Sequence, residues 1–414
     1  GGRNIRIIVV GAGIGGSVLA LALEKAGLDY LVLEQAPALT EVGAGIQLSP
    51  NGVRILEWLG LGEAMAAFCV EPGSHQLKDW RSGKTVLQTP LRSVARKTFG
   101  APYYHAHRAD LIAALACRLN PDRLRLNAKV VSASQGADKV SVVLADGGAE
   151  NGDVLIAADG IHSVVRNQLF NAGAPRSSGY LAWRGVVEVE KAAYLGIEKQ
   201  STAVMGPRLS IVFYYVSGGR RINWVAIGAG DDDKRESWSQ TASKEDVQKS
   251  FTGWYGHARG LVDLTDQLFV TALHDREALP TWINGRVALM GDAAHAMLPY
   301  HAQGAVQSIE DAWVLARCLE IGQKTEGGNV SAALLKFESL RKDRAQRLQH
   351  HSRNAERWYH LEDADEIARR NARLAAHARN NDGGVTPQQA WLYSYDAEKA
   401  VLGTDGEWRA LREW

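Results

Sequence analysis

Hydrophobic residues near the N-terminus follow the pattern of a short buried strand, a turn and a helix. Residues 5–10 form an apolar, β-branched run whose length fits a buried parallel strand. Residues 17–26 have helical composition, and Gly27 stands where a helix C-cap is expected. Residues 30–33 predict a second strand. The pattern therefore predicts a β-α-β unit at the start of the chain.

The hydrophobic pattern changes between about residues 178 and 270. Strand-like runs dominate this segment, at residues 179–188, 210–216 and 222–227. Helical periodicity is weak until residue 244, so we expect an inserted β-rich domain with a largely antiparallel sheet.

These patterns predict an α/β protein of three parts. Residues 1–177 with 271–360 form one discontinuous domain, and residues 178–270 form the inserted β-rich domain. Residues 361–414 form a helical C-terminal tail. Within the first part, residues 84–99 show no regular pattern.

Composition and charge exclude several classes of function. The 414 residues include 47 Lys and Arg against 46 Asp and Glu, so no basic surplus is available for a nucleic acid backbone. No charge-free apolar run is long enough for a membrane span. The three cysteines are widely spaced and form no CxxC pair, which predicts no zinc or other metal site and indicates buried thiols in a cytoplasmic protein (Cys69, Cys117 and Cys318).

Three glycines between the first strand and the first helix fit the dinucleotide-binding fingerprint GxGxxG. Gly11 permits a tight turn, Gly13 allows the backbone to approach a pyrophosphate, and Gly16 allows close packing of helix on strand. The helix N-terminus then faces the phosphates. Glu34 ends the second strand, where an acidic residue binds ribose hydroxyls. Together these features predict a dinucleotide site.

Three further segments resemble motifs of the single-component flavoprotein aromatic hydroxylases. Residues 157–166 (AADGIHSVVR) resemble the DG motif of that family, and residues 289–295 (LMGDAAH) resemble its GD motif. Residues 107–111 (HRADL) resemble its flavin-contacting arginine segment. Residues 180–185 and 273–277 are similar to the salicylate and 3-hydroxybenzoate hydroxylases in particular.

The resemblance implies that residues 1–177 with 271–360 are a Rossmann-like FAD-binding domain of the GR2 type, and that residues 178–270 are an inserted substrate-binding domain. It places contacts to the FAD ribityl and pyrophosphate on Arg108 and Asp292, and a role shared between FAD and NAD(P)H on Asp159. The flavin ring would contact the backbone of Gly45 and Gln47, in the loop after the second strand. Two more cofactor contacts are expected at the start of a late helix, Gly304 and Ala305.

The resemblance also implies the reaction. A phenolic aromatic acid, such as a salicylate or a hydroxybenzoate, would be hydroxylated with O₂ through a flavin C4a-hydroperoxide. The chain has no second GxGxxG, so NADH or NADPH would dock only transiently. A hydroxypyridine, a hydroxyquinoline or a larger phenol remains an alternative substrate, and a flavin-binding regulator without turnover remains an alternative of another class. A monomer and a homodimer are both open.

Candidate substrate residues come from the segments that the resemblance places near the flavin. His301 follows Pro299 in a loop expected to cover the flavin ring, where it would polarise a phenol unless it is a surface histidine. Tyr214 and Ser210 share one face of a strand, and Tyr214 is the second catalytic candidate. Three further candidates are Pro299, Tyr103 and Arg184, and Arg184 would pair with a substrate carboxylate or form a structural ion pair.

Overall fold

The computed structural model describes residues 4–41, 44–230, 243–325, 329–380 and 384–411. The predicted β-α-β unit is confirmed, with β1 and β2 paired in parallel on either side of α1 in the chain. The sheet that contains it has the order β17-β18-β11-β1-β2-β7. Its elements are β1 (Arg6–Val10), α1 (Ile14–Lys25), β2 (Asp29–Leu33), β7 (Leu124–Arg125), β11 (Val154–Ala157), β17 (Ile283–Asn284) and β18 (Val287–Leu289).

Three parallel strands of this sheet end at the same edge. β1, β11 and β18 lie side by side, and the glycine turn, Asp159 and Asp292 follow them directly. In a parallel sheet the carboxyl ends of neighbouring strands form the usual ligand crevice. The strand run is almost completely buried, as expected for a parallel sheet covered by helices.

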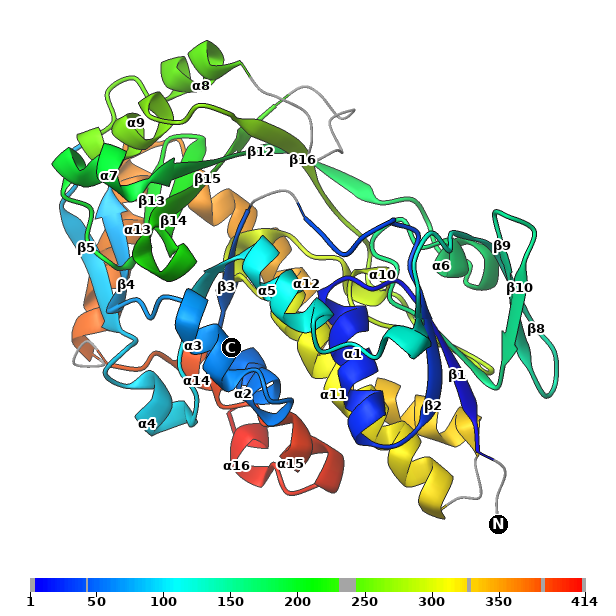
Figure 1. Cartoon of the computed structure of the whole chain (residues 1–414). Helices are drawn as coiled ribbons and strands as arrows, with labels where there is room; N and C mark the ends of the chain where they lie inside the picture. Colours follow the sequence, from blue (N-terminus) through cyan, green and yellow to red (C-terminus); the bar gives the residue numbers. More distant parts are fainter. Residues whose placement is uncertain (1–3, 42–43, 231–242, 326–328, 381–383, 412–414) are drawn as a thin grey trace.

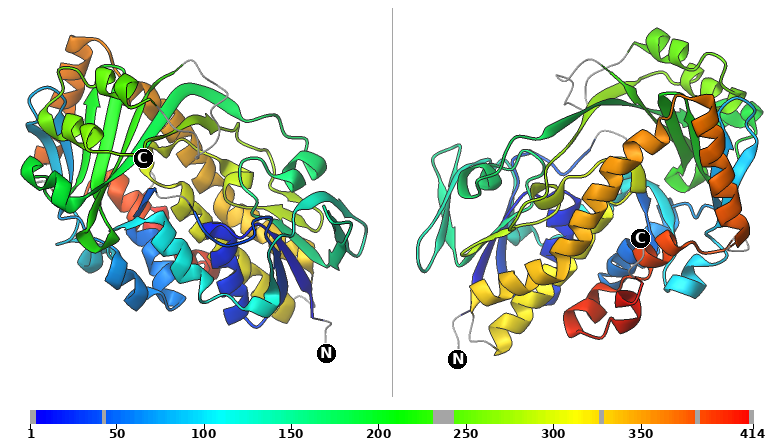
Figure 2. Two further views of the ribbon diagram at one scale, coloured as in Figure 1. Left: turned by 45° about the horizontal axis from the view of Figure 1, so that its top comes forward. Right: turned by 180° about the vertical axis from the view of Figure 1, so that it is seen from behind.

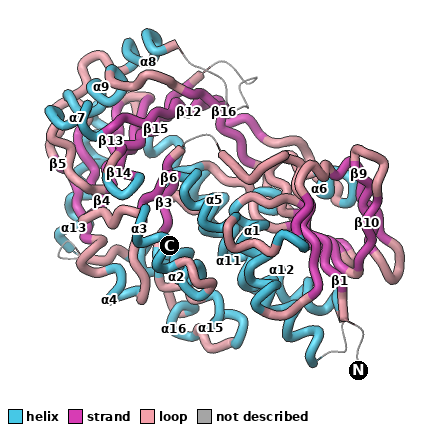
Figure 3. The backbone as a smooth tube through the Cα atoms, viewed as in Figure 1, coloured by secondary structure: helices cyan, strands magenta, loops and turns pink. Residues whose placement is uncertain are grey.

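The second sheet is larger and contains more of the chain than the predicted insert. Its order is β16-β12-β15-β14-β13-β4-β5, and Figure 3 shows its strands gathered away from the parallel sheet. The strands are β4 (Ser74–Asp79), β5 (Thr85–Pro90), β12 (Arg176–Glu188), β13 (Ser201–Gly206), β14 (Leu209–Val216), β15 (Arg221–Ala229) and β16 (Phe269–Asp275).

The boundaries 178–270 are therefore corrected for this sheet. β4 and β5 come from residues 74–90, which the sequence analysis assigned to the nucleotide-binding part. β4 pairs in parallel with β13, more than a hundred residues later, and a local hydrophobic pattern cannot reveal such a pairing. Residues 84–99 also form regular structure, namely β5 and α4 (Ala95–Phe99).

A two-stranded ribbon lies between the sheets. β3 (Gly45–Leu48) pairs with β6 (Tyr104–His107), so that Gln47 stands opposite His105. A separate three-stranded sheet has the order β10-β9-β8. These strands and the flanking helices are β8 (Val130–Gln135), β9 (Val140–Leu144), β10 (Ala149–Gly152), α2 (Pro50–Trp58), α3 (Gly62–Phe68), α5 (Arg108–Ala116) and α6 (Val164–Leu169).

The C-terminal region, predicted as a helical tail over residues 361–414, is helical, and helices already dominate the chain from α11 onward. The long helix α12 runs alongside α11 near the parallel sheet and continues toward the second sheet, as the rear view in Figure 2 shows. α13 then lies against β5, and α14 to α16 return to pack near α2 and α11 (Figure 1). The helices are α7 (Val189–Ala192), α8 (Lys244–Ser250), α9 (Gly256–Asp263), α10 (Asp292–His295), α11 (Gly304–Thr325), α12 (Val330–Tyr359), α13 (Ala364–Asn380), α14 (Pro387–Tyr393), α15 (Ala397–Leu402) and α16 (Gly406–Arg409).

Among the helices of the described residues, none is long and apolar enough to cross a membrane.

Candidate active site

One cavity of about 1750 Å³ runs from the edge of the parallel sheet to the face of the second sheet. It exceeds the roughly 300–1,000 Å³ of a typical single-ligand pocket, so it has room for two ligands at once. The structure brings together in its wall every predicted site residue except Gly16: Gly11, Gly13, Glu34, Gly45, Gln47, Tyr103, Arg108, Asp159, Arg184, Ser210, Tyr214, Asp292, Pro299, His301, Gly304 and Ala305.

The glycine turn has the shape that a bound pyrophosphate requires. Gly11 has a φ of 101°, and an added Cβ would lie 2.3 Å from the Ala158 carbonyl oxygen. A Cβ on Gly16 would lie 2.0 Å from the Gly11 carbonyl oxygen, which explains why Gly16 supports the site without lining it. Around Gly13 a Cβ would meet nothing within 4 Å. No side chain caps the N-terminus of α1, so its backbone N–H groups are available to an anion.

Glu34 is fixed beside this turn by two backbone donors. The Ala12 N–H lies 2.9 Å from Oε1, and the Ala36 N–H lies 2.8 Å from Oε2. The carboxylate thus lines the cavity at the end of β2, where the sequence placed a ribose contact.

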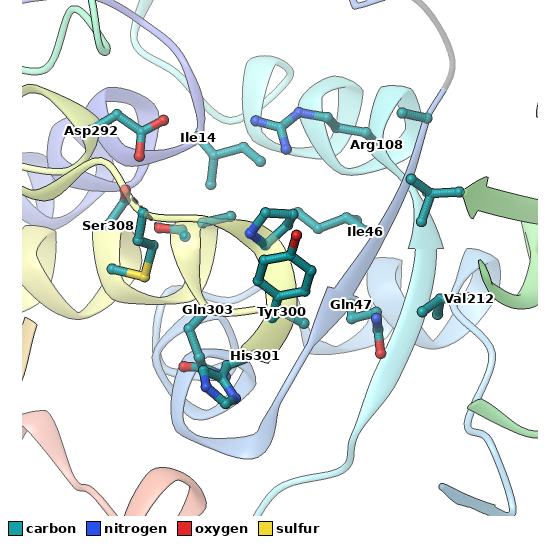
Figure 4. A pocket seen from close by; sticks show the side chains of 18 of the residues that line it. Ile14, Ile46, Gln47, Arg108, Val212, Asp292, Tyr300, His301, Gln303 and Ser308 are labelled. Atoms are coloured by element: carbon teal, nitrogen blue, oxygen red, sulfur yellow. Dashed lines mark hydrogen bonds between the residues drawn. The ribbon is translucent and has the colours of Figure 1, made fainter. Parts of the chain in front are cut away.

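Two aspartates and an arginine face the same space. Asp159 accepts a hydrogen bond from the Val164 N–H at 3.1 Å through Oδ2, while its buried Oδ1 has no partner within the described residues. Burial raises the pKa of Asp159. In Figure 4, the Asp292 carboxylate and the Arg108 guanidinium extend toward each other on either side of Ile14. Arg108 also pairs with Glu41.

The chemistry of this part of the cavity wall fits a flavin dinucleotide. It offers a carboxylate oxygen unpaired among the described residues, a turn of glycines and side chains of both charges. The orphaned Asp159 oxygen and the uncapped α1 terminus provide acceptors and donors for ribose and pyrophosphate groups. Arg108 provides a cation, and Gly304 begins α11 at the cavity wall.

A buried charge network, which the sequence analysis missed, holds the loop before Asp292. Asp311 accepts from the Gly291 N–H at 2.9 Å and lies 2.5 Å from Nε2 of His295. Arg341 donates to Asp311 and to Glu310, at 2.7 Å each. Burial raises the pKa of Asp311, but His295 and Arg341 outweigh it and hold that pKa below its ordinary value. The only signal for this network in the sequence was the pair of adjacent acidic residues, Glu310 and Asp311, within a predicted helix.

At the other end of the cavity, Gln47 is the centre of a polar cluster. Its Oε1 accepts from the Tyr103 hydroxyl at 2.8 Å and from the Ser201 hydroxyl at 3.2 Å, and it lies 3.2 Å from Nε2 of His105. The predicted contact between the Gln47 backbone and the flavin stays a prediction, and the Gln47 side chain, visible in Figure 4, is held by other residues of the protein.

Buried aromatic and imidazole rings complete this cluster. His105 stacks on Tyr214 with ring centroids 4.0 Å apart, and Nε2 of His75 lies 3.1 Å from the Tyr393 hydroxyl. Burial lowers the pKa of His75 to about 4 and that of His105 well below its ordinary value, so both rings are neutral near pH 7. His75, His105 and Tyr393 come from β4, β6 and α14, and no sequence motif links them.

Arg184 brings a positive charge to the cavity wall from β12. Burial lowers its pKa to about 10, which still leaves it charged at neutral pH, and the nearby Tyr214 hydroxyl opposes that shift. Burial raises the pKa of Tyr214 in turn, against the smaller effect of Arg184. A charged guanidinium and a neutral phenol therefore stand close together on the substrate side.

His301 lies in the loop that the sequence placed over the flavin ring. Its Nδ1 is 3.0 Å from Nε2 of Gln388, a residue of α14. Burial lowers the pKa of His301 to about 4, and His351 adds to the effect. His301 is therefore a neutral, half-buried imidazole. The predicted tail contributes to the cavity wall through Gln388 and Tyr393.

A glycine cradle suited to a flavin dinucleotide opens into the same cavity as the Arg184 guanidinium and the neutral rings, which is the arrangement expected of a flavin-dependent oxidoreductase. The FAD binding domain family matches residues 4–352. The chain is 35% identical to 3-amino-4-hydroxybenzoate 2-monooxygenase of Streptomyces cremeus, covering 95% of this chain and 96% of that one. It is also 35% identical to 3-hydroxybenzoate 6-hydroxylase 1 of Aquipseudomonas alcaligenes, covering 94% and 97%.

Solved structures agree with these relatives. A salicylate hydroxylase substrate complex superposes with a TM-score of 0.81 at 28% identity, covering 96% of this chain and 97% of that one. HpxO of Klebsiella pneumoniae, complexed with FAD and uric acid, gives a TM-score of 0.80 at 28% identity, covering 98% and 97%. The chain belongs to the FAD binding domain family, and it is a FAD-dependent monooxygenase of aromatic compounds. The predicted α/β class, the FAD-binding domain and the flavoprotein hydroxylase family are confirmed.

Proposed function

We propose that this protein hydroxylates a phenolic aromatic acid with O₂ and with NADH or NADPH as the electron donor. The observation that carries the proposal is the charged guanidinium of Arg184 on the cavity wall, which also carries the neutral imidazoles of His75 and His301. A guanidinium on the cavity wall favours a carboxylate on the substrate. The relatives named for 3-amino-4-hydroxybenzoate and 3-hydroxybenzoate support the same choice.

The first task of the chain is to hold FAD. FAD, when bound, supplies the two-electron chemistry that accepts hydride and activates O₂. The uncapped N-terminus of α1 and Arg108 would offset the charge of the pyrophosphate, and Glu34 would accept from ribose hydroxyls. Asp159, Asp292, Gly304 and Ala305 would complete the contacts, with Gly45 and Gln47 beside the flavin ring through their backbone.

The second task is to orient the substrate. Arg184 would bind its carboxylate in a bidentate manner, while Tyr103, Ser210 and Pro299 shape the chamber. Tyr214 and His301 would polarise the phenol. Both are neutral near pH 7, so they act through hydrogen bonds rather than through charge. The surrounding rings exclude water from the reacting atoms.

The nicotinamide would dock transiently in the same cavity, because the described residues provide one glycine fingerprint and one parallel sheet. Location in the cytoplasm and a monomeric or homodimeric state stay predictions of the sequence.

The proposal is tested with purified, FAD-loaded protein and a panel of hydroxybenzoates and hydroxynicotinates. We expect at least one acid to stimulate NADH or NADPH oxidation, with a hydroxylated product identified by mass spectrometry. Hydrogen peroxide is measured alongside to detect uncoupled turnover, and the matching neutral phenols serve as controls. If FAD is bound but no acid stimulates oxidation, the proposed substrate class is wrong.

A further inference from the structure

Along two rows of paired residues, the wall that β13, β14 and β15 present to the cavity is apolar except at Ser210. Met205 and Ile227 are the cross-strand neighbours of Ser210, and Val212 begins the next row. We call the five apolar residues of these rows the apolar strip: Ala203, Met205, Val212, Val225 and Ile227. A flat apolar surface with one polar atom suits an aromatic ring that carries one polar substituent.

The hydroxyl of Ser210 is bound to a histidine whose tautomer the structure determines. His360 caps the carboxyl end of α12, and its Nδ1 lies 2.8 Å from the Glu356 carbonyl oxygen. A carbonyl oxygen can only accept, so Nδ1 must carry a hydrogen. Burial lowers the pKa of His360 to about 4, against the smaller effect of the Glu356 and Ile227 backbone carbonyls, so the ring is neutral at pH 7 and carries one N–H, which the 2.8 Å contact to Glu356 places on Nδ1. Its Nε2 therefore has no hydrogen and accepts.

This tautomer fixes the direction of the hydrogen bond from Ser210. The Oγ lies 2.9 Å from Nε2 of His360, so the single hydroxyl hydrogen is donated there. Tyr180 stacks on the imidazole at 4.8 Å, and Tyr300 meets it edge-on at 5.8 Å, which holds the ring in place. The remaining lone pairs of the Ser210 oxygen are left for a ligand in the cavity.

We propose that the Ser210 oxygen accepts a hydrogen bond from a neutral phenolic hydroxyl or an aromatic amine on the substrate ring. His360 is the positioning residue that makes Ser210 an acceptor. A methoxy group or a phenolate at this position brings no hydrogen and is disfavoured. The inference rests on the proposed function, and it adds a ring substituent to the carboxylate assigned to Arg184.

Ligand titrations test the discrimination. FAD-loaded protein is titrated with 2-, 3- and 4-hydroxybenzoate and the matching methoxybenzoates, followed by flavin absorbance. The hydroxybenzoate that binds most tightly should have an affinity on the order of tenfold higher than that of its methoxy counterpart, which corresponds to one good hydrogen bond. Ser210→Ala should reduce this ratio toward one.

His360→Phe separates hydrogen bonding from size. This change leaves the cavity wall and Ser210 in place but frees the hydroxyl hydrogen, so the ratio should also fall toward one. If the methyl group is rejected only for its size, the ratio will stay high in His360→Phe, and this result would overturn the proposal. His257→Phe, in the half-buried histidine of α9, is the matched control and should keep the full ratio.

Nitrogen-15 NMR of the imidazole tests the tautomer without any ligand. The His360 signals, identified by their loss in His360→Phe, should show a neutral ring protonated at Nδ1. An Nε2–H tautomer or a charged ring at pH 7 would overturn the proposal. If no hydroxybenzoate binds, the proposed aromatic-acid function is wrong, and the substrate group assigned to Ser210 is wrong as well. Binding without discrimination overturns only the role of Ser210 and His360.

Discussion

At the scale of single residues, burial leaves Arg184 on the cavity wall charged but makes two histidines of that wall neutral. Arg184 keeps a charge because its pKa of about 10 stays well above neutral pH even in a buried position. His75 and His301 lose theirs, since burial costs an imidazolium more than its weak basicity can offset. The cavity wall therefore combines the fixed charge of Arg184 with the neutral imidazoles of His75 and His301.

Arg184→Met should weaken binding of an aromatic acid by about tenfold or more, because a charge-assisted hydrogen bond contributes roughly 1.5–3 kcal/mol. A neutral phenol of equal size should bind almost as before. Both ligands are titrated by flavin absorbance, with the exposed Arg208→Met as the matched control. Equal weakening of acid and phenol, together with loss of flavin, would instead indicate a structural role for Arg184.

Glu356 gives a pH dependence that can be measured. Burial raises its pKa from 4.5 to about 7, although the Tyr300 hydroxyl, Arg176 and Arg353 oppose the shift and Asp275 adds to it. The folded state thus binds more protons than the unfolded state between about pH 4.5 and 7, and the free energy of unfolding falls as the pH rises through that window.

Glu356→Gln should remove that part of the pH dependence, so the variant loses less stability than the wild type between pH 5 and 7. Urea unfolding at pH 5, 6, 7 and 8 measures the difference. Glu362→Gln, in an exposed carboxylate just beyond α12, should leave the curve unchanged. Parallel curves for wild type and Glu356→Gln would contradict the prediction.

At the scale of elements, two glycines of the turn between β1 and α1 have different structural roles. Gly16 is needed for packing, since any Cβ there meets the Gly11 carbonyl. Gly13 is needed for the ligand, since its Cβ position is open in the protein itself but lies at the cavity wall.

Gly16→Ala and Gly13→Ala should therefore fail in different ways. Gly16→Ala should lower the melting temperature of FAD-free and FAD-loaded protein alike, because helix and turn must move apart. Gly13→Ala should leave the FAD-free melting temperature nearly unchanged and reduce the FAD retained after gel filtration. Thermal unfolding and flavin absorbance measure both, and the same loss of stability in both FAD-free variants would refute the distinction.

At the scale of the whole molecule, buried ions connect parts that are far apart in the chain. Glu310 of α11 accepts from Arg341 and Arg344 of α12 and, at 2.6 Å, from the side chain of Asn51 in α2. Arg344 also donates to the Trp391 and Leu392 carbonyls and lies over the Tyr395 ring. The C-terminal tail is thus fixed to the helices that carry the flavin loops.

Glu310→Gln should destabilise the protein by about 3–5 kcal/mol, because it leaves two buried guanidinium groups without their shared carboxylate. Burial raises the pKa of Glu310, yet Arg344 and Arg341 hold it below its ordinary value, so the group is ionised in the folded state. Urea unfolding of the FAD-loaded protein measures the loss. Glu407→Gln, in an exposed side chain of α16, is the control, and an effect no larger than the control's would contradict the role of the network.

The nucleotide half of the site was predictable because its chemistry is local. Gly11, Gly13 and Gly16 lie next to a strand and a helix whose patterns are readable, and Glu34 ends the next strand. Asp159 and Asp292 also follow buried strands directly, so the sheet topology brings them to the edge where the glycine turn lies.

The substrate half was decided only by the tertiary structure. Ser210 was visible as a candidate, but the acceptor that orients it, His360, lies 150 residues later and lies beside it only because α12 reaches the second sheet. His75 and Tyr393 meet across 318 residues for a similar reason, since β4 joins that sheet and α14 folds back over it. Sequence alone determines contacts that neighbouring residues specify through backbone conformation, whereas long-range pairing of strands and docking of helices decide which polar groups share a buried chamber.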